Sequence, residues 1–187
     1  MKIHHTNLKN LLLIEPEIYE DERGYFYESF NSRKLLSLLN LKDNAFVQDN
    51  QSKSKKGVLR GLHFQKIPAE QGKLVRVVNG SVLDVVVDIR KDSETYGEHF
   101  SIKLSGENHK MLWIPSGFAH GFLSLEDDTI FCYKCTNYYS KEFERCIVWN
   151  DFDLNIDWGI ENPIVSEKDQ KGIEMKDLKD NTFIAAT

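Results

Sequence analysis

The sequence is short of the features that mark several large classes of protein. It has three cysteines, an odd number that does not suit a disulfide scaffold, and only four prolines. Its 187 residues contain no internal repeat, low-complexity tract or linker, and 41% hydrophobic with 28% charged residues is an ordinary globular composition. We therefore expect a single domain that spans residues 1–187.

Long hydrophobic runs and an excess of basic charge are also missing. No apolar stretch approaches membrane-spanning length, and residues 1–10 lack the apolar core of a signal peptide. We therefore expect a cytoplasmic protein with no membrane partner. The formal net charge of −5 argues against nucleic acid as the main partner, because phosphate backbones bind basic faces. A small phosphorylated ligand remains compatible, since a few well-placed cationic side chains can hold one.

The cysteines Cys132 and Cys135 form a C-x-x-C pair within the strand-like segment TIFCYKCTNYY. Side chains three residues apart on a strand point to opposite faces of the sheet. A redox C-x-x-C pair instead lies at the start of a helix. No second C-x-x-C is present to complete a zinc site. We interpret these two cysteines, and Cys146, as structural.

What the sequence does have is a series of short strand patterns separated by turn residues. Their number and spacing favour an all-β sandwich or barrel. Asn79-Gly80, between two β-branched runs, predicts a hairpin because both residues tolerate positive φ. A leucine stripe predicts one helix over 31–41, with Asn31 or Ser32 as its cap. The candidate strands are 11–15, 25–30, 45–50, 58–65, 73–78, 81–89, 99–104, 111–114, 120–125, 129–138 and 146–149.

The strand VLRGLHFQ at 58–65 carries polar groups in a segment built for burial. Arg60 and His63 lie at positions of opposite parity, so a regular strand cannot aim both into one cavity. A bulge at Gly61 can, and glycine within a strand is typical of bulges. The ordinary interpretation is a hydrogen-bonded structural histidine. The alternative is a cation and a base that share a pocket.

Other polar groups each allow a plain interpretation and a functional one. Lys73, at the start of a strand, is either solvated or placed to stabilise negative charge on a substrate oxygen. Tyr133 is either half-buried packing or a proton carrier. Asp169, in the acidic segment SEKD, is either solvated or orients His63.

Pro115, Gly117 and His120 have the P-x-G-x-x-H spacing of the second cupin motif, in which the histidine is often a metal ligand. The first motif would add H-x-H and a glutamate, but the earlier strand supplies only His63. Two histidines make a poor metal site. The pattern indicates a cupin barrel that does not use a metal.

Taken together, the motifs resemble the dTDP-4-dehydrorhamnose 3,5-epimerase family from about residue 10 to residue 172. The resemblance implies an all-β cupin-type jelly roll (a double-stranded β-helix) with a few short peripheral helices. It implies a homodimer without cofactor or metal. The motifs are DERGYFYESF, VQDNQSKSKKGVLRGLHFQ, QGKLVRVVNGSVLDVVVDIRK, LWIPSGFAHGF, YKCTNYYS, ERCIVWND and SEKD.

The resemblance also implies a reaction and a set of site residues. The family converts dTDP-4-dehydro-6-deoxy-D-glucose to dTDP-4-dehydro-L-rhamnose, for dTDP-L-rhamnose in surface polysaccharide such as O-antigen. Its catalytic base falls on His63 and its tyrosine acid on Tyr133. The carboxylate partner falls on Asp169 and the cation near the keto oxygen on Lys73. Tyr139 matches the residue that stacks on the thymine ring. The other substrate-contact positions are Arg23, Glu28, Gln48, Asn50, Arg60, His120, Glu144 and Lys168.

Elementary chemistry agrees with these roles. A proton next to a carbonyl is a weak acid, and its removal needs a base of near-neutral pKa and a positive charge beside the forming enolate. Inversion then needs a second proton carrier on the opposite face of the sugar. Three alternatives remain open at this point: an epimerase acting at C3 or C5 only, a metal-dependent cupin, and a non-catalytic module that binds sugar nucleotides.

Overall fold

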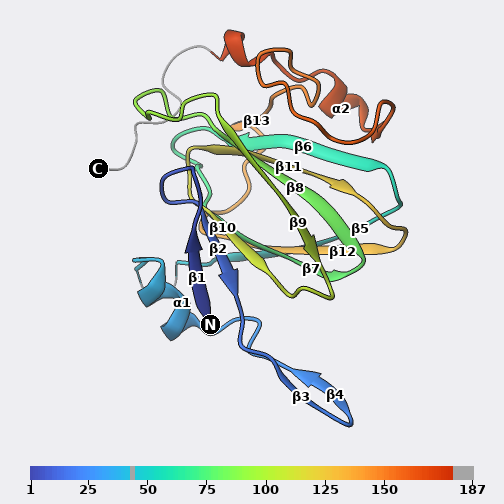
Figure 1. Cartoon of the computed structure of the whole chain (residues 1–187). Helices are drawn as coiled ribbons and strands as arrows, with labels where there is room; N and C mark the ends of the chain where they lie inside the picture. The colour runs from blue at the N-terminus through green and yellow to red at the C-terminus, as the bar shows by residue number, and fades with distance from the viewer. Residues whose placement is uncertain (43–44, 179–187) are drawn as a thin grey trace.

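Two facing β-sheets form the body of the molecule, which a computed structural model describes within residues 1–42 and 45–178 (Figure 1). Residues 43–44 and 179–187 of the predicted domain lie outside the described residues. The first sheet has the order β1-β2-β10-β7-β12-β5. Its strands are β1 Lys2–His5, β2 Leu12–Glu15, β5 Gln48–Ser54, β7 Lys73–Asn79, β10 Met111–Ile114 and β12 Thr129–Cys135.

The second sheet has the order β13-β6-β11-β8-β9, with β14 added beside β6. Its strands pair antiparallel except for the short β14, and the two sheets enclose a common interior. The predicted all-β jelly roll of the cupin type is confirmed. The strands are β6 Val58–Gln65, β8 Ser81–Asp88, β9 His99–Ser105, β11 Phe118–Ser124, β13 Glu144–Cys146 and β14 Ile164–Val165.

The turn at Asn79-Gly80 corrects one prediction. It does not close a hairpin, because β7 belongs to the first sheet and β8 to the second. Gly80 does adopt positive φ, at 74°. A Cβ on it would lie 2.4 Å from the Thr129 hydroxyl oxygen. The pattern identified a tight reversal, but local sequence cannot tell whether the next strand continues the same sheet or crosses to the other.

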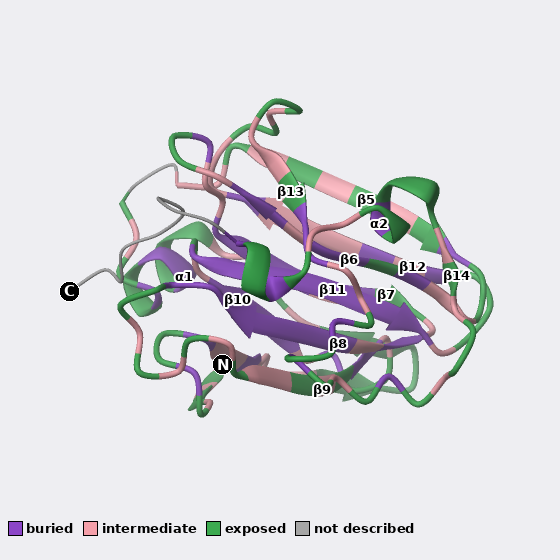
Figure 2. Cartoon of the chain, turned by 90° about the horizontal axis from the view of Figure 1, so that it is seen from above, coloured by how far each residue is buried: buried purple, intermediate pink, exposed green. Residues whose placement is uncertain are grey.

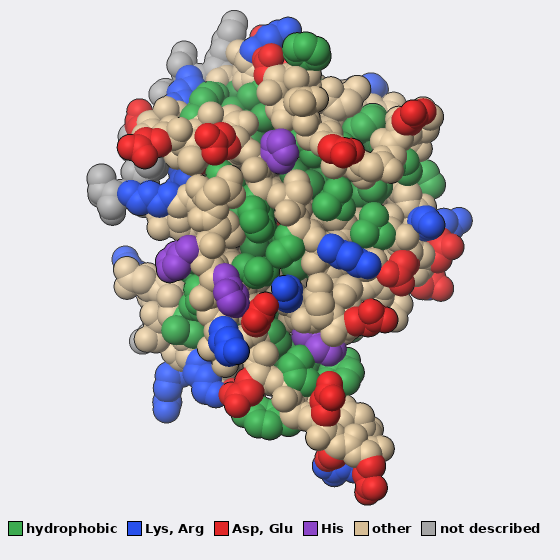
Figure 3. All heavy atoms as spheres, in the orientation of Figure 1, with side chains coloured by type: hydrophobic (Ala, Val, Ile, Leu, Met, Phe, Trp, Pro, Cys, Tyr) green, Lys and Arg blue, Asp and Glu red, His purple; other side chains and the backbone are tan. Residues whose placement is uncertain are grey.

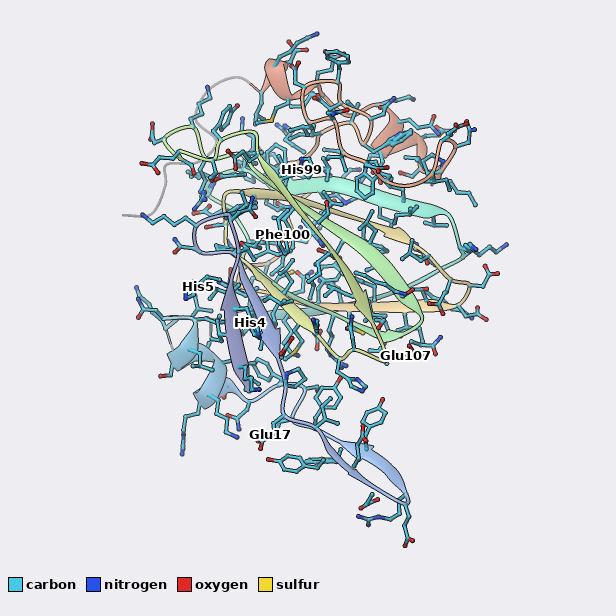
Figure 4. All side chains as sticks on the ribbon, in the orientation of Figure 1. His4, His5, Glu17, His99, Phe100 and Glu107 are labelled. Atoms are coloured by element: carbon cyan, nitrogen blue, oxygen red, sulfur yellow. The ribbon has the colours of Figure 1, made fainter. Side chains whose placement is uncertain are left out.

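Alternating side chains divide the hydrophobic residues between the interior and the outer faces. On β8, Val82 and Val86 join the cluster between the sheets, while Val85 and Val87 pack under the C-terminal segment. Figure 2 shows β8 and β11 buried along most of their length, and Figure 4 shows side chains filling the space between the sheets. Asp84 and Asp88 are completely buried, so the β8 face that carries them is not open to solvent.

Short helices lie at the edges of the sheets. Helix α1, Ser32–Leu38, packs on the outer face of the first sheet, and the Asn31 side chain accepts a hydrogen bond from the N–H of Lys34 as its cap. Helix α2, Glu167–Gln170, and the 3₁₀ turn η1, Met175–Asp177, follow in the C-terminal segment. None of the described helices has the length and hydrophobicity that a membrane crossing requires.

A two-stranded hairpin, β3 Tyr19–Asp21 and β4 Gly24–Phe26, projects from the body of the molecule (Figure 1). Glu17 lies at its base in Figure 4. Tyr19, Tyr25 and Phe26 each leave more than half of their surface in solvent. The space-filling view in Figure 3 shows acidic and basic side chains interspersed on one face, with no extended basic patch there.

Candidate active site

An extra residue in β6 aims His63 into the interior. Between β6 and β11, His63 pairs with His120 and Arg60 with Phe122, so β6 uses one residue more than its partner over this step. Gly61 takes up the irregularity at φ 127°, where a Cβ would lie 2.4 Å from the Gly121 Cα. The predicted bulge is confirmed, and no other residue type fits this backbone without displacing β11.

A carboxylate holds the imidazole of His63 from the outer side. The Asp169 Oδ1 lies 2.8 Å from Nε2 of His63, and its Oδ2 accepts a hydrogen bond from the N–H of Gly61 at 3.2 Å. Asp169 lies in α2, and Ser166 caps that helix by accepting from its N–H. Burial works to raise the pKa of the Asp169 carboxyl, but His63 and the Gly61 N–H hold that pKa below its ordinary value. The predicted partnership of these two residues is present.

Tyr133 from β12 and Lys73 from β7 reach the same small cavity as His63. The cavity has a volume of about 110 Å³. The Lys73 ammonium group donates to the main-chain oxygen of His63 at 3.4 Å. The residues that line it are Gln48, Asn50, His63, Phe64, Gln65, Gln71, Lys73, Tyr133, Tyr139 and Glu144.

Burial shifts the pKa values of Lys73 and Tyr133. It lowers the pKa of Lys73, against the opposing effect of Cys135, Asp84 and Glu144. It raises the pKa of Tyr133, so that the phenol keeps its proton at neutral pH. A protonated phenol and the buried amino group of Lys73 share one cavity with a carboxylate-bound imidazole.

The mouth of the cavity carries a hydrogen-bonded chain of side chains. The Tyr139 hydroxyl donates to Glu144 at 3.0 Å, and Lys168 donates to the other oxygen of that carboxylate at 2.8 Å. Burial raises the pKa of Glu144, but Lys168 and Tyr139 outweigh it and lower the pKa. Gln48 accepts from the N–H of Tyr139 and donates to Asn50. These five side chains were predicted as substrate contacts; four of them line the cavity, and Lys168 is joined to it through Glu144.

Arg60 leaves β6 on the side that faces the first sheet. Its Nε donates to the Ser54 hydroxyl at 3.2 Å, and the residue is exposed. It is near enough to Tyr133 for its charge to lower the pKa of that phenol. Leu59 and Leu62 both pack in the cluster under the C-terminal segment, so the bulge turns Arg60 and His63 together to the other side of β6, toward the first sheet.

His120 is placed differently from a substrate contact. Its Nε2 lies 3.0 and 2.9 Å from the two carboxylate oxygens of Asp84, its ring stacks on Phe131, and it does not line the cavity. His63 and His120 are cross-strand neighbours, yet each is bound to its own carboxylate. The two histidines of the cupin pattern thus form separate acid–base pairs and no common ligand set.

Arg23 and Glu28, two further predicted contacts, lie away from the cavity within this chain. Arg23 is at the tip of the projecting hairpin and forms an ion pair with Asp21. Glu28 binds Lys34 and accepts from Asn31 at the start of α1. The structure of one chain does not bring these two residues to the other site residues.

Sequence reasoning missed several residues of the site. Gln65 lies two residues after His63 and therefore on the same face of β6, and this spacing was the available sign that Gln65 belongs to the site. Cys146 on β13 lies directly opposite His63 on β6, and burial raises the pKa of its thiol to about 12. Asp84 shares a face of β8 with Asp88, but nothing in the local sequence predicts that it binds His120.

A larger hollow, of about 440 Å³, lies on the outer face of the first sheet. Asp49, Arg76 and Lys134 line it together with the outer side of β12. This hollow is larger than the cavity at His63, but no histidine lines it, so it offers no histidine base for the reaction. The smaller cavity holds three different proton-handling groups within reach of one ligand.

Comparisons with known proteins give a consistent result. The family model described as dTDP-4-dehydrorhamnose 3,5-epimerase matches residues 5–177. A protein with that name from Shigella flexneri is 51% identical over 177 residues, which is 95% of this chain and 97% of the relative.

Solved structures agree with this match. That of the dTDP-6-deoxy-D-glucose-3,5-epimerase from Legionella pneumophila in complex with dTDP-4-keto-L-rhamnose has a TM-score of 0.90 at 48% identity, over 95% of this chain and 94% of that one. A 3'-monoepimerase from Streptomyces bikiniensis in complex with dTDP-quinovose has a TM-score of 0.87 at 31% identity, over 92% and 87%.

Proposed function

Since the chain belongs to the dTDP-4-dehydrorhamnose 3,5-epimerase family, we propose that it inverts C3 and C5 of dTDP-4-dehydro-6-deoxy-D-glucose. The product is dTDP-4-dehydro-L-rhamnose, on the route to dTDP-L-rhamnose. The observation that carries the proposal is the cavity shared by His63, Tyr133 and Lys73. The chain is accordingly an isomerase.

The reaction begins when His63 removes a proton next to the ketone. Because Nε2 faces the Asp169 carboxylate at 2.8 Å, the ring proton resides on Nε2 and the lone pair on Nδ1. Nδ1 has no hydrogen-bond partner among the described residues, so it is free to accept the proton from carbon. Asp169 stabilises the imidazolium that forms.

Lys73 stabilises the enolate. C3 and C5 both flank the C4 ketone, so one ammonium group beside the ketone oxygen serves both inversions. Lys73 is only 9% exposed and makes one long hydrogen bond, to the His63 main chain. Its remaining N–H groups are therefore available to the developing oxyanion, in surroundings of low polarity where the attraction is strong.

Tyr133 completes each inversion by returning a proton from the opposite face of the sugar. Its raised pKa keeps the phenol protonated until the enolate forms. The carbon gains the phenol proton. His63 then releases the proton that it took to water, and water returns a proton to the Tyr133 phenolate, so both groups regain their starting protonation. The atoms balance, and the substrate and product are isomers.

The nucleotide lies outside the cavity in this proposal. A volume of about 110 Å³ is well below the roughly 300–1,000 Å³ of common small-molecule sites, so the cavity has room for the sugar alone. Arg60 and Lys168 at the rim supply charge for the diphosphate. Tyr139, half exposed, offers a flat ring for the base.

A homodimer completes the site in the same proposal. Arg23 is predicted as a substrate contact, yet it lies at the tip of a hairpin that projects from its own chain (Figure 1). The exposed rings of Tyr25 and Phe26 on that hairpin favour a partner surface over solvent. We infer that each hairpin reaches the cavity of the second copy. The single domain over residues 1–187 and the cytoplasmic location stay predictions.

Deuterium exchange tests the activity. In D₂O, the purified protein with the 4-keto sugar nucleotide should introduce deuterium at C3 and at C5, measured by NMR. His63→Ala should reduce both rates by about 10²–10⁴-fold, because the base is lost. No exchange at either carbon in the parent protein would end the proposal. Deuterium at one carbon only would instead identify a mono-epimerase, such as the Streptomyces bikiniensis relative.

A second variant tests the role of the phenol. Tyr133→Phe should retain most of the exchange while net inversion falls steeply, because the base remains and the opposite-face donor does not. Tyr138→Phe is the matched control, since that ring is 67% exposed and does not line the cavity. Equal loss of exchange and inversion in Tyr133→Phe would contradict the division of the two faces.

A further inference from the structure

A third side chain lies beside the His63–Asp169 pair. The ligand atoms of His63, Cys146 and Asp169 all lie within 4.8 Å of one another. Cys146 reaches this place because β13 pairs with β6 in the register that sets it opposite His63. The thiol is buried, and its one hydrogen bond is a weak contact with the Ile147 main-chain oxygen at 3.4 Å. The proposed reaction makes no use of Cys146.

We propose that these three side chains form an inhibitory site for Zn²⁺. An imidazole nitrogen, a thiolate and a carboxylate oxygen are the ligands that Zn²⁺ prefers, and water supplies the fourth position of a tetrahedron. The thiol proton leaves to solvent as the sulfur–zinc bond forms. The cation is an inhibitor here, and no step of the epimerisation involves it.

The geometry is close to that of a zinc site. Two ligands about 2.0–2.1 Å from a tetrahedral zinc ion are ~3.3 Å apart, and a nitrogen and a sulfur are ~3.5 Å apart. The His63 Nε2 and Asp169 Oδ1 are now 2.8 Å apart, so this pair opens by about half an ångström. Asp169 keeps its second anchor, because Oδ2 accepts from the Gly61 N–H. Insertion of the ion costs the His63–Asp169 hydrogen bond and, since the three ligand atoms now lie within 4.8 Å of one another, an approach of the sulfur by up to about 1.3 Å.

Bound zinc removes the base, a consequence that rests on the proposed function. Nε2 is the nitrogen that faces Asp169, so it is the one that coordinates the ion. A neutral imidazole coordinated through Nε2 carries its proton on Nδ1. The lone pair that accepts the substrate proton is then absent, and catalysis stops although the cavity is unchanged.

The ligand set also predicts which ions act. A thiolate ligand favours Zn²⁺ and Co²⁺ over Mg²⁺ and Ca²⁺, which prefer oxygen. Cys132 provides a matched control thiol. It lies in β12 on the outer side of the first sheet and contacts Gln51 there.

Cobalt spectroscopy tests for the thiolate ligand directly. Co²⁺ added to the metal-free protein should produce a thiolate-to-cobalt charge-transfer band in the near ultraviolet at one ion per chain, and Zn²⁺ should abolish it. Cys146→Ser and Cys146→Ala should lose the band, whereas Cys132→Ser should keep it. No thiolate band in the parent protein, or a band lost only in Cys132→Ser, overturns the proposal.

Inhibition by zinc tests the consequence. Zn²⁺ should inhibit epimerisation, EDTA should restore it, and Mg²⁺ at equal concentration should have no effect. Cys146→Ser should require about 10- to 100-fold more Zn²⁺ for the same inhibition. Equal sensitivity of Cys146→Ser and the parent protein would refute the inhibitory role. Activity measured in EDTA reports on the proposed function separately, so failure of one idea is distinguishable from failure of the other.

Discussion

At the scale of single residues, the site depends on buried polar groups whose partners are few and specific. Asp169 is 3% exposed, and both of its carboxylate oxygens are hydrogen-bonded to β6, one to His63 and one to the Gly61 N–H. Lys73 is nearly as buried and makes one hydrogen bond. A carboxylate that is fully hydrogen-bonded stabilises the fold, whereas a sparsely bonded buried ammonium group costs stability. The difference fits their roles, since Lys73 must keep its donors for a ligand.

Asp169→Asn should lower kcat by about 10²–10⁴-fold, because an amide at this position can donate to Nε2 of His63 and so place the ring proton on Nδ1. Glu167→Gln, exposed on the same helix, should leave kcat unchanged. Steady-state kinetics of the two variants check this. Retained activity in Asp169→Asn would exclude the carboxylate from orienting the base.

The lowered pKa of Asp169 predicts how the unfolding free energy depends on pH. The pKa of Asp169 is lower in the folded chain than its ordinary value, so its stabilising effect is complete above that ordinary value, about 3.9, and is lost as the pH falls through the lower one. The unfolding free energy of the parent protein should exceed that of Asp169→Asn by a constant amount near neutral pH. The gap should narrow below about pH 4, as measured by urea unfolding. A constant gap at acidic pH would contradict the lowered pKa.

At the scale of elements, strand β6 positions the base through its irregularity. The bulge at Gly61 turns His63 inward, and Gly121 on β11 leaves the space that the bulge needs. A regular strand would send the imidazole and the guanidinium group to opposite faces, whereas the bulge turns both toward the first sheet. The positive φ of Gly61 is therefore part of the construction of the site.

Gly61→Ala should destabilise the fold by at least about 2 kcal/mol, because the added Cβ meets main-chain atoms of β11 and the positive φ is strained. Gly97→Ala is the matched control. Its φ is also positive, at 82°, but no atom lies within 4 Å of the new Cβ, so it should cost only about 1 kcal/mol. Denaturant unfolding of both variants measures the difference, and equal losses would show that the contact with β11 is unimportant.

At the scale of the whole molecule, the jelly roll provides a walled cavity but not all of the expected contacts. The two sheets bring β5, β6, β7 and β12 around one opening, although these strands are spread over half of the chain. The hairpin that carries Arg23 projects from the body of the molecule (Figure 1), and none of its residues lines the cavity. The proposed homodimer accounts for both observations, since a projecting arm can reach the cavity of a second copy.

Subunit mixing tests this arrangement. His63→Ala and Arg23→Ala should each be nearly inactive alone. After the two are mixed in equal amounts and exchange subunits, about a quarter of the parent activity should return, because half of the dimers are mixed and each mixed dimer has one intact site. Arg23→Ala mixed with itself is the control. No recovery in verified mixed dimers would show that each chain supplies its own Arg23.

The resemblance of the ordered motifs to a known family implied most of the residues at the cavity. The alternation of apolar residues and the turn residues determined the all-β class, the helix near 31–41 and the bulge at Gly61. These follow from local properties, since side-chain parity, turn residues and motif spacing all act within a few positions along the chain. The sheet that each strand joins is different, because it depends on contacts between distant segments. For that reason the Asn79-Gly80 turn was wrongly predicted to close a hairpin.

Only the tertiary structure decided how the polar groups pair. It fixed the 2.8 Å contact of Asp169 with His63, a partnership that the family resemblance implied, and it paired His120 with Asp84. It also brought Cys146 beside the base and carried Arg23 away from it. The physical reason is that pairing distances of a few ångströms arise from strand register and sheet packing, which sum over the whole chain and leave no mark in any short segment.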